Sequence, residues 1–171
     1  MNEEIIMKKM FAAAAFAAIS LSAGAAYAAP IAEEAGAGAN IIAPLEIRNT
    51  ASLYFGTIAP SLTQADVVVV TPDGDKKCGR ELTCLTSDHT AAAFDVRGEA
   101  DAAYTISLPL GIEITNDKGD GMKVFDFRGS KDGGRLVKGQ DNFTVGGKLF
   151  VSERQAAGKY TGRFVVAVEY Q

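Results

Sequence analysis

Hydrophobic and polar residues alternate along most of the chain beyond residue 44. The pattern begins at residues 45–47 and returns at 53–55, with two apolar side chains flanking a more polar one. A period of two places successive side chains on opposite faces of an extended chain, so each stretch predicts a half-buried β-strand. The same alternation predicts short strands at residues 94–97, 104–108, 112–114, 122–127 and 143–151.

Three stretches depart from simple alternation. Val67–Val70 is a continuous β-branched run, bounded by Asp66 and the turn residues 72–75, and predicts a strand buried on both faces or nearly so. Gly146–Gly147 interrupts a strand pattern, which predicts a bulge or a close approach of two backbones. Residues 129–142 have no period, and we expect a mobile loop there.

The clearest alternation closes the chain. From residue 160 to residue 170, apolar side chains and one glycine occupy the even positions, which predicts one long final strand. The chain therefore holds about eight or nine short strands with turn signals between them and no amphipathic helical stretch. This pattern predicts an all-β fold of the β-sandwich type.

The first 28 residues have the three zones of a secretory signal peptide. Lys8–Lys9 precede an apolar stretch at residues 10–21, and small residues follow up to Ala28, where we expect cleavage. The apolar stretch is shorter than the roughly 20 residues of a membrane span, so we expect no transmembrane anchor. Met7 is an alternative start to Met1. The predicted destination is the periplasm, the cell surface or the extracellular space.

Residues 29–40 are small and rich in glycine and alanine, which is typical of a flexible N-terminal arm. Residues 41–171 are then long enough to form one domain with its own core. The sequence thus predicts a cleaved signal peptide, an arm and a single sandwich domain.

The net charge argues against one class of partner, and the two cysteines predict a disulfide. The formal net charge is −4, which argues against nucleic acid as a partner, because its binding needs a basic face. Cys78 and Cys84 are the two cysteines, and an exported chain meets an oxidising compartment, so we expect a disulfide between them. A loop this short would fix local shape.

No constellation of residues predicts catalysis. A hydrolase triad needs a base beside its nucleophile, and the single histidine, His89, lies in a polar stretch without a nucleophile elbow. A zinc site would need more histidine or cysteine ligands than the chain has. We therefore expect no enzymatic activity, no cofactor and no metal site, with a hydrolase kept as a remote third hypothesis.

A set of short motifs, by its order and spacing along the chain, resembles a family of secreted bacterial proteins known only as domain of unknown function 4402. The resemblance runs from about residue 39 to the end of the chain. It rests on residues 44–47, 53–58, 94–98, 104–109, 149–151, Gln155 and 158–170, and its structural positions include Gly56, Gly98, Tyr104, Gly158, Tyr160, Gly162 and Tyr170. Tyr160 is expected to form a tyrosine corner by bonding to upstream backbone.

The C-terminus also resembles that of pilins assembled by chaperone and usher, because Gly158 opens the final strand and the penultimate residue is Tyr170. This resemblance implies an incomplete immunoglobulin-like sandwich that is completed by a strand from the next subunit, through β-strand addition. The candidate donor is the arm, in which small side chains alternate with glycine and asparagine at Ala35, Ala37, Ala39 and Ile41. The local cysteine pair departs from those pilins.

Two functions therefore lead. The first is a non-enzymatic structural or adhesion-type protein, such as a fimbria-like subunit that binds itself or sister subunits by strand addition. The second is a monomeric module that binds an envelope polysaccharide or protein, with residues 76–85 and 129–142 as its binding loops. An open sheet edge long enough to take a strand would favour the first function.

Overall fold

The computed structural model describes residues 31–85 and 88–171. The predicted signal peptide lies outside these residues. Residues 31–39 belong to one unit and have no regular secondary structure. The other unit, Asn40–Gln171, holds all the strands.

The described residues form strands and no helix, which confirms the predicted all-β class. Eight of the twelve strands have four residues or more, close to the number that the alternation predicted. The other four are two- or three-residue strands that no period could reveal. The strands are β1 (Glu46–Ala51), β2 (Ile58–Ala59), β3 (Asp66–Val70), β4 (Lys76–Lys77), β5 (Thr83–Cys84), β6 (Ala92–Arg97), β7 (Ala103–Ser107), β8 (Gly111–Thr115), β9 (Gly121–Gly129), β10 (Gly133–Arg135), β11 (Gln140–Val151) and β12 (Ala167–Tyr170).

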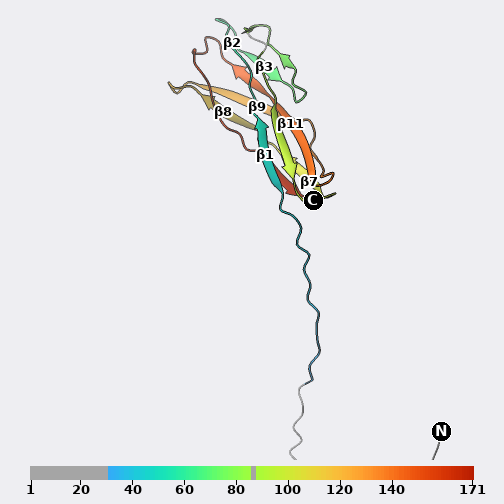
Figure 1. Cartoon of the computed structure of the whole chain (residues 1–171). Helices are drawn as coiled ribbons and strands as arrows, with labels where there is room; N and C mark the ends of the chain where they lie inside the picture. Colours follow the sequence, from blue (N-terminus) through green and yellow to red (C-terminus); the bar gives the residue numbers. More distant parts are fainter. Residues whose placement is uncertain (1–30, 86–87) are drawn as a thin grey trace, which may run out of the picture. The chain divides into compact units, whose positions relative to one another are not determined.

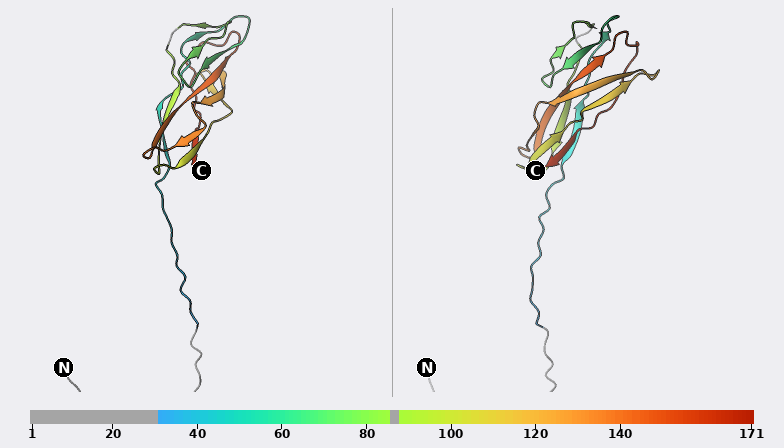
Figure 2. Two further views of the ribbon diagram at one scale, coloured as in Figure 1. Left: turned by 90° about the vertical axis from the view of Figure 1, so that its right-hand side faces the viewer. Right: turned by 180° about the vertical axis from the view of Figure 1, so that it is seen from behind.

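These strands form a β-sandwich. The largest sheet has seven strands, with β1-β6-β11-β3-β4 as its path and β9 joining β8 to β11. A second sheet has the order β10-β7-β12, and β2 pairs with β5. Figures 1 and 2 show the sheets curling around one interior, with β2 and β3 at one end of the domain and β7 at the other.

The twelve-residue strand β11 is the centre of the large sheet. It pairs with β6 through residues 140–145, with β3 through 147–151 and with β9 through 145–149. The register with β9 shifts between Gly146 and Lys148, which confirms the irregularity predicted at the glycine pair. β3 and β9 pair with overlapping parts of β11, so they lie along its opposite edges.

The predicted mobile loop at residues 129–142 is wrong in its central part. Gly133–Arg135 form β10 and pair with β7, so this stretch adds a strand to the smaller sheet. A Cβ on Gly133 would lie 2.4 Å from the carbonyl oxygen of Tyr104, closer than any real contact. Glycine is needed for this approach of two backbones, and because glycine has no side chain it leaves no alternation to read.

The predicted final strand is also shorter than the alternation indicated. The strand spans only Ala167–Tyr170, and Thr161 makes an isolated bridge to Thr115. Residues 162–166 lie between them. They keep the alternating sequence pattern of a strand, but they pair with no neighbouring strand. Residues 162–164 of this unpaired stretch form part of one wall of an apolar groove.

The core lies between the sheets and is almost wholly apolar. Phe94 of β6 stacks on Phe143 of β11, with ring centroids 5.2 Å apart. Phe164 contacts Phe127 at 4.7 Å and the edge of Phe94 at 6.4 Å, so the unpaired C-terminal stretch is held to the core by its aromatic side chain. The expected disulfide between Cys78 and Cys84 is present.

Candidate functional site: an apolar groove over the sandwich core

A groove of about 1040 Å³ lies in the described part of the domain. Its two walls are stretches of extended chain, one within residues 49–60 and the other within 155–164. Its floor consists of core side chains from four strands, namely Phe94, Ile112, Ile114, Met122, Val124, Phe127, Leu149 and Val151. A space of this size and lining resembles a ligand site rather than a packing defect.

The first wall continues the line of β1. Tyr54 exchanges main-chain hydrogen bonds with Thr90, at 2.9 and 3.0 Å, so its polar groups point away from the groove. Successive residues of an extended chain direct their main-chain groups to alternate edges. Leu53 and Phe55 therefore direct theirs toward the second wall, and among the described residues these groups have no hydrogen-bond partner.

The second wall leads into β12. The N–H of Gln171 donates to the carbonyl of Ala103, and β12 pairs with β7 in steady register, so odd-numbered residues face β7. Phe164 and Val166 then direct their N–H and C=O groups to the opposite edge. No described residue pairs with them there.

Local contacts hold the second wall in place without closing the groove. The Tyr160 hydroxyl donates to the carbonyl of Ala156 at 2.7 Å, the upstream bond expected of a tyrosine corner, and accepts from the Gln155 amide at 3.0 Å. A Cβ on Gly162 would lie 2.6 Å from the Cγ2 atom of Ile114, so glycine lets the chain pass close over β8.

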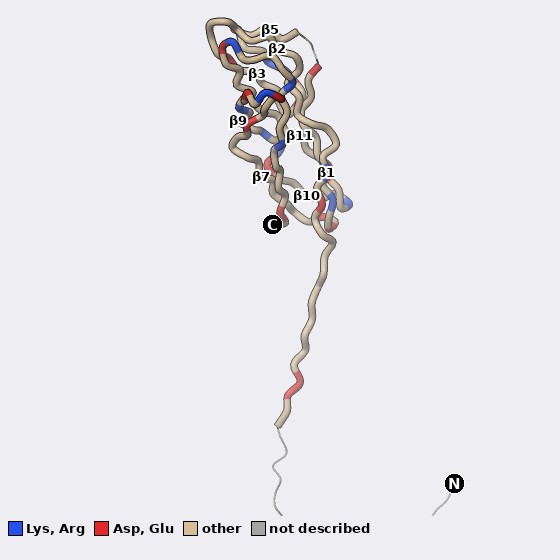
Figure 3. Tube along the Cα trace, turned by 90° about the vertical axis from the view of Figure 1, so that its left-hand side faces the viewer, with Lys and Arg blue, Asp and Glu red and all other residues tan. Residues whose placement is uncertain are grey.

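The groove has a simple electrostatic character. Among its described lining residues, the charged ones are Lys159 and Arg163, both cationic and both on the second wall. Elsewhere on the domain, basic and acidic residues are interspersed (Figure 3). An apolar segment carrying negative charge would therefore fit this groove better than a basic one.

At the far end of the second wall, a clamp of three residues joins the chain's end to the base of the arm. The Tyr170 hydroxyl accepts from the N–H of Glu99 at 2.6 Å and donates to the carbonyl of Ala43 at 2.9 Å. The Glu99 carboxylate accepts from the N–H of Ala43 at 2.9 Å. A Cβ on Gly98 would lie 2.2 Å from the Tyr170 hydroxyl oxygen, so this position must be glycine for the clamp to form.

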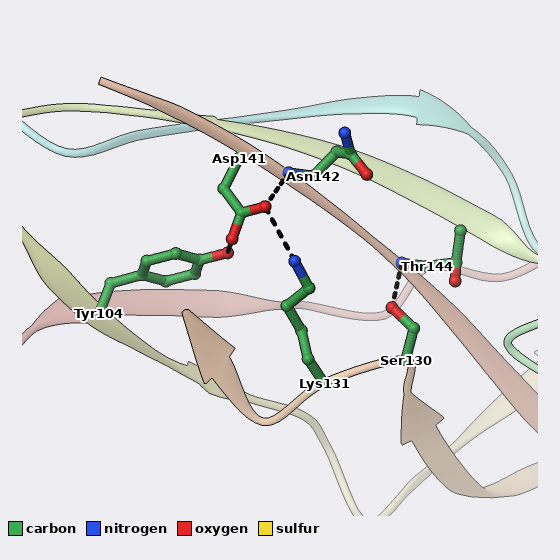
Figure 4. Close-up of polar contacts among 6 residues, drawn as sticks. All are labelled: Tyr104, Ser130, Lys131, Asp141, Asn142 and Thr144. Carbon is green, nitrogen blue, oxygen red and sulfur yellow. Dashed lines mark hydrogen bonds and ion pairs between the residues drawn. The ribbon is translucent and has the colours of Figure 1, made fainter. Parts of the chain in front are cut away.

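A polar cluster behind the smaller sheet is a second candidate site (Figure 4). The Tyr104 hydroxyl donates to Asp141 Oδ2 at 2.9 Å, and Lys131 Nζ donates to Asp141 Oδ1 at 2.8 Å. Burial and the neighbouring Asp141 raise the pKa of Tyr104 well above its usual value. Burial alone would raise the pKa of Asp141, but hydrogen bonds from Lys131, Tyr104 and the Asn142 N–H outweigh it and lower that pKa. The cluster is internally satisfied and presents no free nucleophile or base, which indicates a structural role.

Polar groups in and around the disulfide loop also have hydrogen-bond partners. The N–H of Glu81 and then that of Val67 donate to Asp66, and they hold the pKa of this carboxyl below its usual value. A ring nitrogen of His89 lies 2.8 Å from the carbonyl oxygen of Gly74. Among the described residues, no cluster of three or more acidic, histidine or cysteine side chains could hold a metal ion.

The structure distributes the seven motif residues over three places. Gly56, Gly158, Tyr160 and Gly162 line the groove. Gly98 and Tyr170 belong to the clamp, and Tyr104 belongs to the polar cluster. The candidate donor residues Ala35, Ala37 and Ala39 lie in the unit that precedes the domain, and Ile41 is 93% exposed at the start of the domain.

Sequence reasoning missed the floor of the groove and two residues that hold its surroundings. Alternation showed that Ile112 and Ile114 share a face of β8, but not that this face lies under a gap. Glu99 and Asp141 gave no signal, because their partners are far away in sequence.

Fold and groove together define a class: a β-sandwich domain with an apolar groove between the segment that follows its first strand and the segment that precedes its last strand. The chain belongs to the family described as Domain of unknown function (DUF4402), whose model matches residues 45–170 and confirms the resemblance. No curated protein and no solved structure matches the chain. Within the described residues, no helix is long and apolar enough to cross a bilayer.

Proposed function

We propose that the protein is a non-enzymatic, exported structural or adhesion-type subunit, and that its groove accepts a β-strand from a binding partner. One observation carries the proposal: an apolar groove whose two walls direct unpaired main-chain groups toward each other. An inserted strand would bond to Leu53 and Phe55 on one side and to Phe164 and Val166 on the other. Its alternate side chains would enter the groove, as in β-strand addition.

The energetics favour occupation of this site. Each main-chain hydrogen bond formed in place of a bond to water contributes about 0.5–1.5 kcal/mol, and each large apolar side chain that is buried adds about 1.5–3 kcal/mol. The empty edge is also a hazard, because an unpaired edge promotes uncontrolled association. A dedicated partner strand would satisfy the edge and fill the cavity.

Replacing Val166 by proline tests the proposal. Val166 lies two residues beyond the groove-lining Phe164, and proline there removes an N–H on the same edge of the chain, which has no partner to lose among the described residues. Val166→Ala is the matched control, because it shortens the half-buried side chain but keeps the N–H. We expect native and Val166→Ala proteins to assemble in size-exclusion chromatography and electron microscopy of the cell-envelope fraction, and Val166→Pro to stay monomeric.

Amide exchange measured by mass spectrometry gives the opposing outcome. A native protein that is strictly monomeric, with rapidly exchanging amides at Phe164 and Val166, would overturn strand acceptance. That result would favour the alternative, a monomeric module that binds an envelope polysaccharide or protein through its loops.

A further inference from the structure

We infer that the solvent side of the large sheet binds a polysaccharide that carries carboxylate groups. The surface concerned, here called the lysine–phenylalanine face, consists of Val67, Val69, Lys123, Phe125, Lys148 and Phe150. It is the reverse side of β9 and β11, two of the strands whose inner side forms the groove floor. The inference goes beyond the proposed function, and either can fail without the other.

The strand register places these side chains together on one side of the sheet. Paired residues of neighbouring strands point to the same side, and successive residues point to opposite sides. One paired row of β3, β11 and β9 is at most 3% exposed and faces the core, namely Val68, Leu149 and Val124. The adjoining rows therefore face solvent. In one of them Val69 pairs with Lys148 and Lys148 with Phe125, and in the other Val67 pairs with Phe150.

The lysine–phenylalanine face is more apolar than the rest of the same sheet. An antiparallel sheet with one side on the core presents polar side chains to water on the other side. Around β6 the sheet follows this rule, since Arg48 pairs with Asp95 and Asp95 with Asn142. Around β11 two valines and two phenylalanines occupy such positions, and Phe150 is 40% exposed. Apolar side chains gathered on an exposed surface mark an interaction site.

The same side of the sheet is basic, although the formal net charge of the chain is −4. On the solvent side of β3, β4, β8, β9 and β11 the charged residues are Lys77, Lys123, Arg128, Lys148, Glu113 and Asp126. Both carboxylate oxygens of Asp126 are already bound, one by Lys148 at 2.8 Å and the other by Arg128 at 2.9 Å. The excess of cations fits an anionic partner.

The position of Lys148 favours a polysaccharide over a protein or a bilayer. Lys148 lies between Val69 and Phe125, so a dry interface over this face would take its ammonium group out of water, which is costly. A polysaccharide stays hydrated and lets the ammonium group keep water-mediated contacts.

The two kinds of side chain on the face match the two kinds of group on such a polymer. The C–H groups on the faces of sugar rings pack on phenyl rings, whose faces are electron-rich. Carboxylates pair with lysines, and Lys123 Nζ lies 5.9 Å from the centre of the Phe125 ring, so both contacts are available side by side. Across β4, β3, β11 and β9 the surface extends for roughly 14 Å, at about 4.8 Å per strand, which suits an extended polymer.

The test is affinity electrophoresis of the purified protein in native gels that contain polygalacturonate. We expect this polymer to retard the native protein, and its fully methyl-esterified form, which has lost the carboxylates, not to retard it. Phe150→Ser and Lys123→Gln should each weaken binding at least about fivefold. Lys123 is exposed, so its variant keeps its fold even if urea unfolding shows that Phe150→Ser is destabilised.

Matched controls lose the same kinds of side chain at exposed positions away from the face. Leu110 is 97% exposed, and Lys138 lies in the exposed turn before β11, so Leu110→Ser and Lys138→Gln should bind polygalacturonate like the native protein. Val166→Pro should also bind it normally, because the groove lies on the other side of the sheet. A loss of assembly and a loss of polymer binding are thus separate results.

Four results would overturn the inference. The first is no retardation by polygalacturonate, and the second is equal retardation of the native protein and both face variants. The third is equally tight binding of polyglutamate that Phe150→Ser does not weaken, which would show attraction by charge alone. The fourth is binding to phosphatidylglycerol vesicles but not to polygalacturonate, which would assign the face to a lipid surface.

Discussion

Three tyrosine hydroxyls make hydrogen bonds that hold the domain together, and two of them join residues that are far apart in sequence. Tyr104 bonds to Asp141, Tyr170 bonds to Ala43 and the Glu99 N–H, and Tyr160 bonds to Ala156. The sequence predicted only the Tyr160 bond, because that partner lies four residues upstream in a recognisable corner. The other partners depend on how strands pair, which no local pattern contains.

Tyr160→Phe should lower the free energy of unfolding by about 1 kcal/mol. The change removes the hydroxyl that donates to Ala156 and accepts from Gln155, so a main-chain carbonyl loses its partner. Urea unfolding measures the loss. Tyr54→Phe is the control, since the Tyr54 side chain is 51% exposed and its hydroxyl has no partner among the described residues. Equal stability of both variants and the native protein would contradict the corner.

Asp141→Asn should cost about 1–2 kcal/mol at pH 7, because the neutral amide no longer attracts Lys131. Hydrogen bonds from Lys131 and Tyr104 hold the folded-state pKa of Asp141 below the ordinary value of an aspartate, about 3.8. Its charge therefore stabilises the fold above about pH 4, and this stability is lost as the pH falls through the folded pKa. Urea unfolding at pH 7 and pH 2.5 should show the difference from the native protein shrinking at low pH. Asp117→Asn, which also removes one carboxylate but from an exposed turn, is the matched control at both pH values.

At the scale of strands, alternation identified the long elements and failed at the short ones. β1, β6, β7 and β11 carry enough residues for a period to appear. β10 contains two glycines and β2 has two residues, so neither could show one. The predicted length of the final strand was wrong for another reason. Its alternation does reflect burial, since Phe164 and Val166 pack on the core. The central part of the predicted strand, however, has no neighbouring strand to pair with.

Replacing both Cys78 and Cys84 by serine should lower stability by about 2 kcal/mol, the chain-entropy term for so short a loop. Since the Asp66 carboxylate still binds the Glu81 N–H, increased amide exchange should stay within residues 76–85. Reduction of the native protein by dithiothreitol should reproduce both effects. Exchange that spreads into β6 or β11 would show that the disulfide supports the whole sandwich.

At the scale of the molecule, the fold class could be predicted from the sequence but the groove could not. The groove exists because residues 53–55 and 162–164 come to lie on opposite sides of a gap, and their separation is a property of sheet topology. Each wall alone has the pattern of an ordinary half-buried strand. The motif glycines gave a partial signal, because Gly56, Gly158 and Gly162 all line the space.

If copies of the protein associate through the groove, thermal stability should depend on protein concentration. Mass action stabilises whatever state binds a partner, so each tenfold rise in concentration should raise the unfolding midpoint by about 2–5 °C. Scanning calorimetry over a hundredfold range measures this. The Val166→Pro variant should have a midpoint that does not move, whereas a fixed midpoint for the native protein would contradict association through the groove.

The position of β11 at the centre of the large sheet also has a consequence for the speed of folding. β11 is made late in synthesis, yet β3, β6 and β9 all pair with it, and Asp66 finds its partner only at Val151. Contacts between such remote parts of a chain form slowly, because the entropy of closing a long loop is lost before any hydrogen bond can offset it. A stopped-flow refolding measurement should therefore give a time of roughly milliseconds to seconds rather than microseconds.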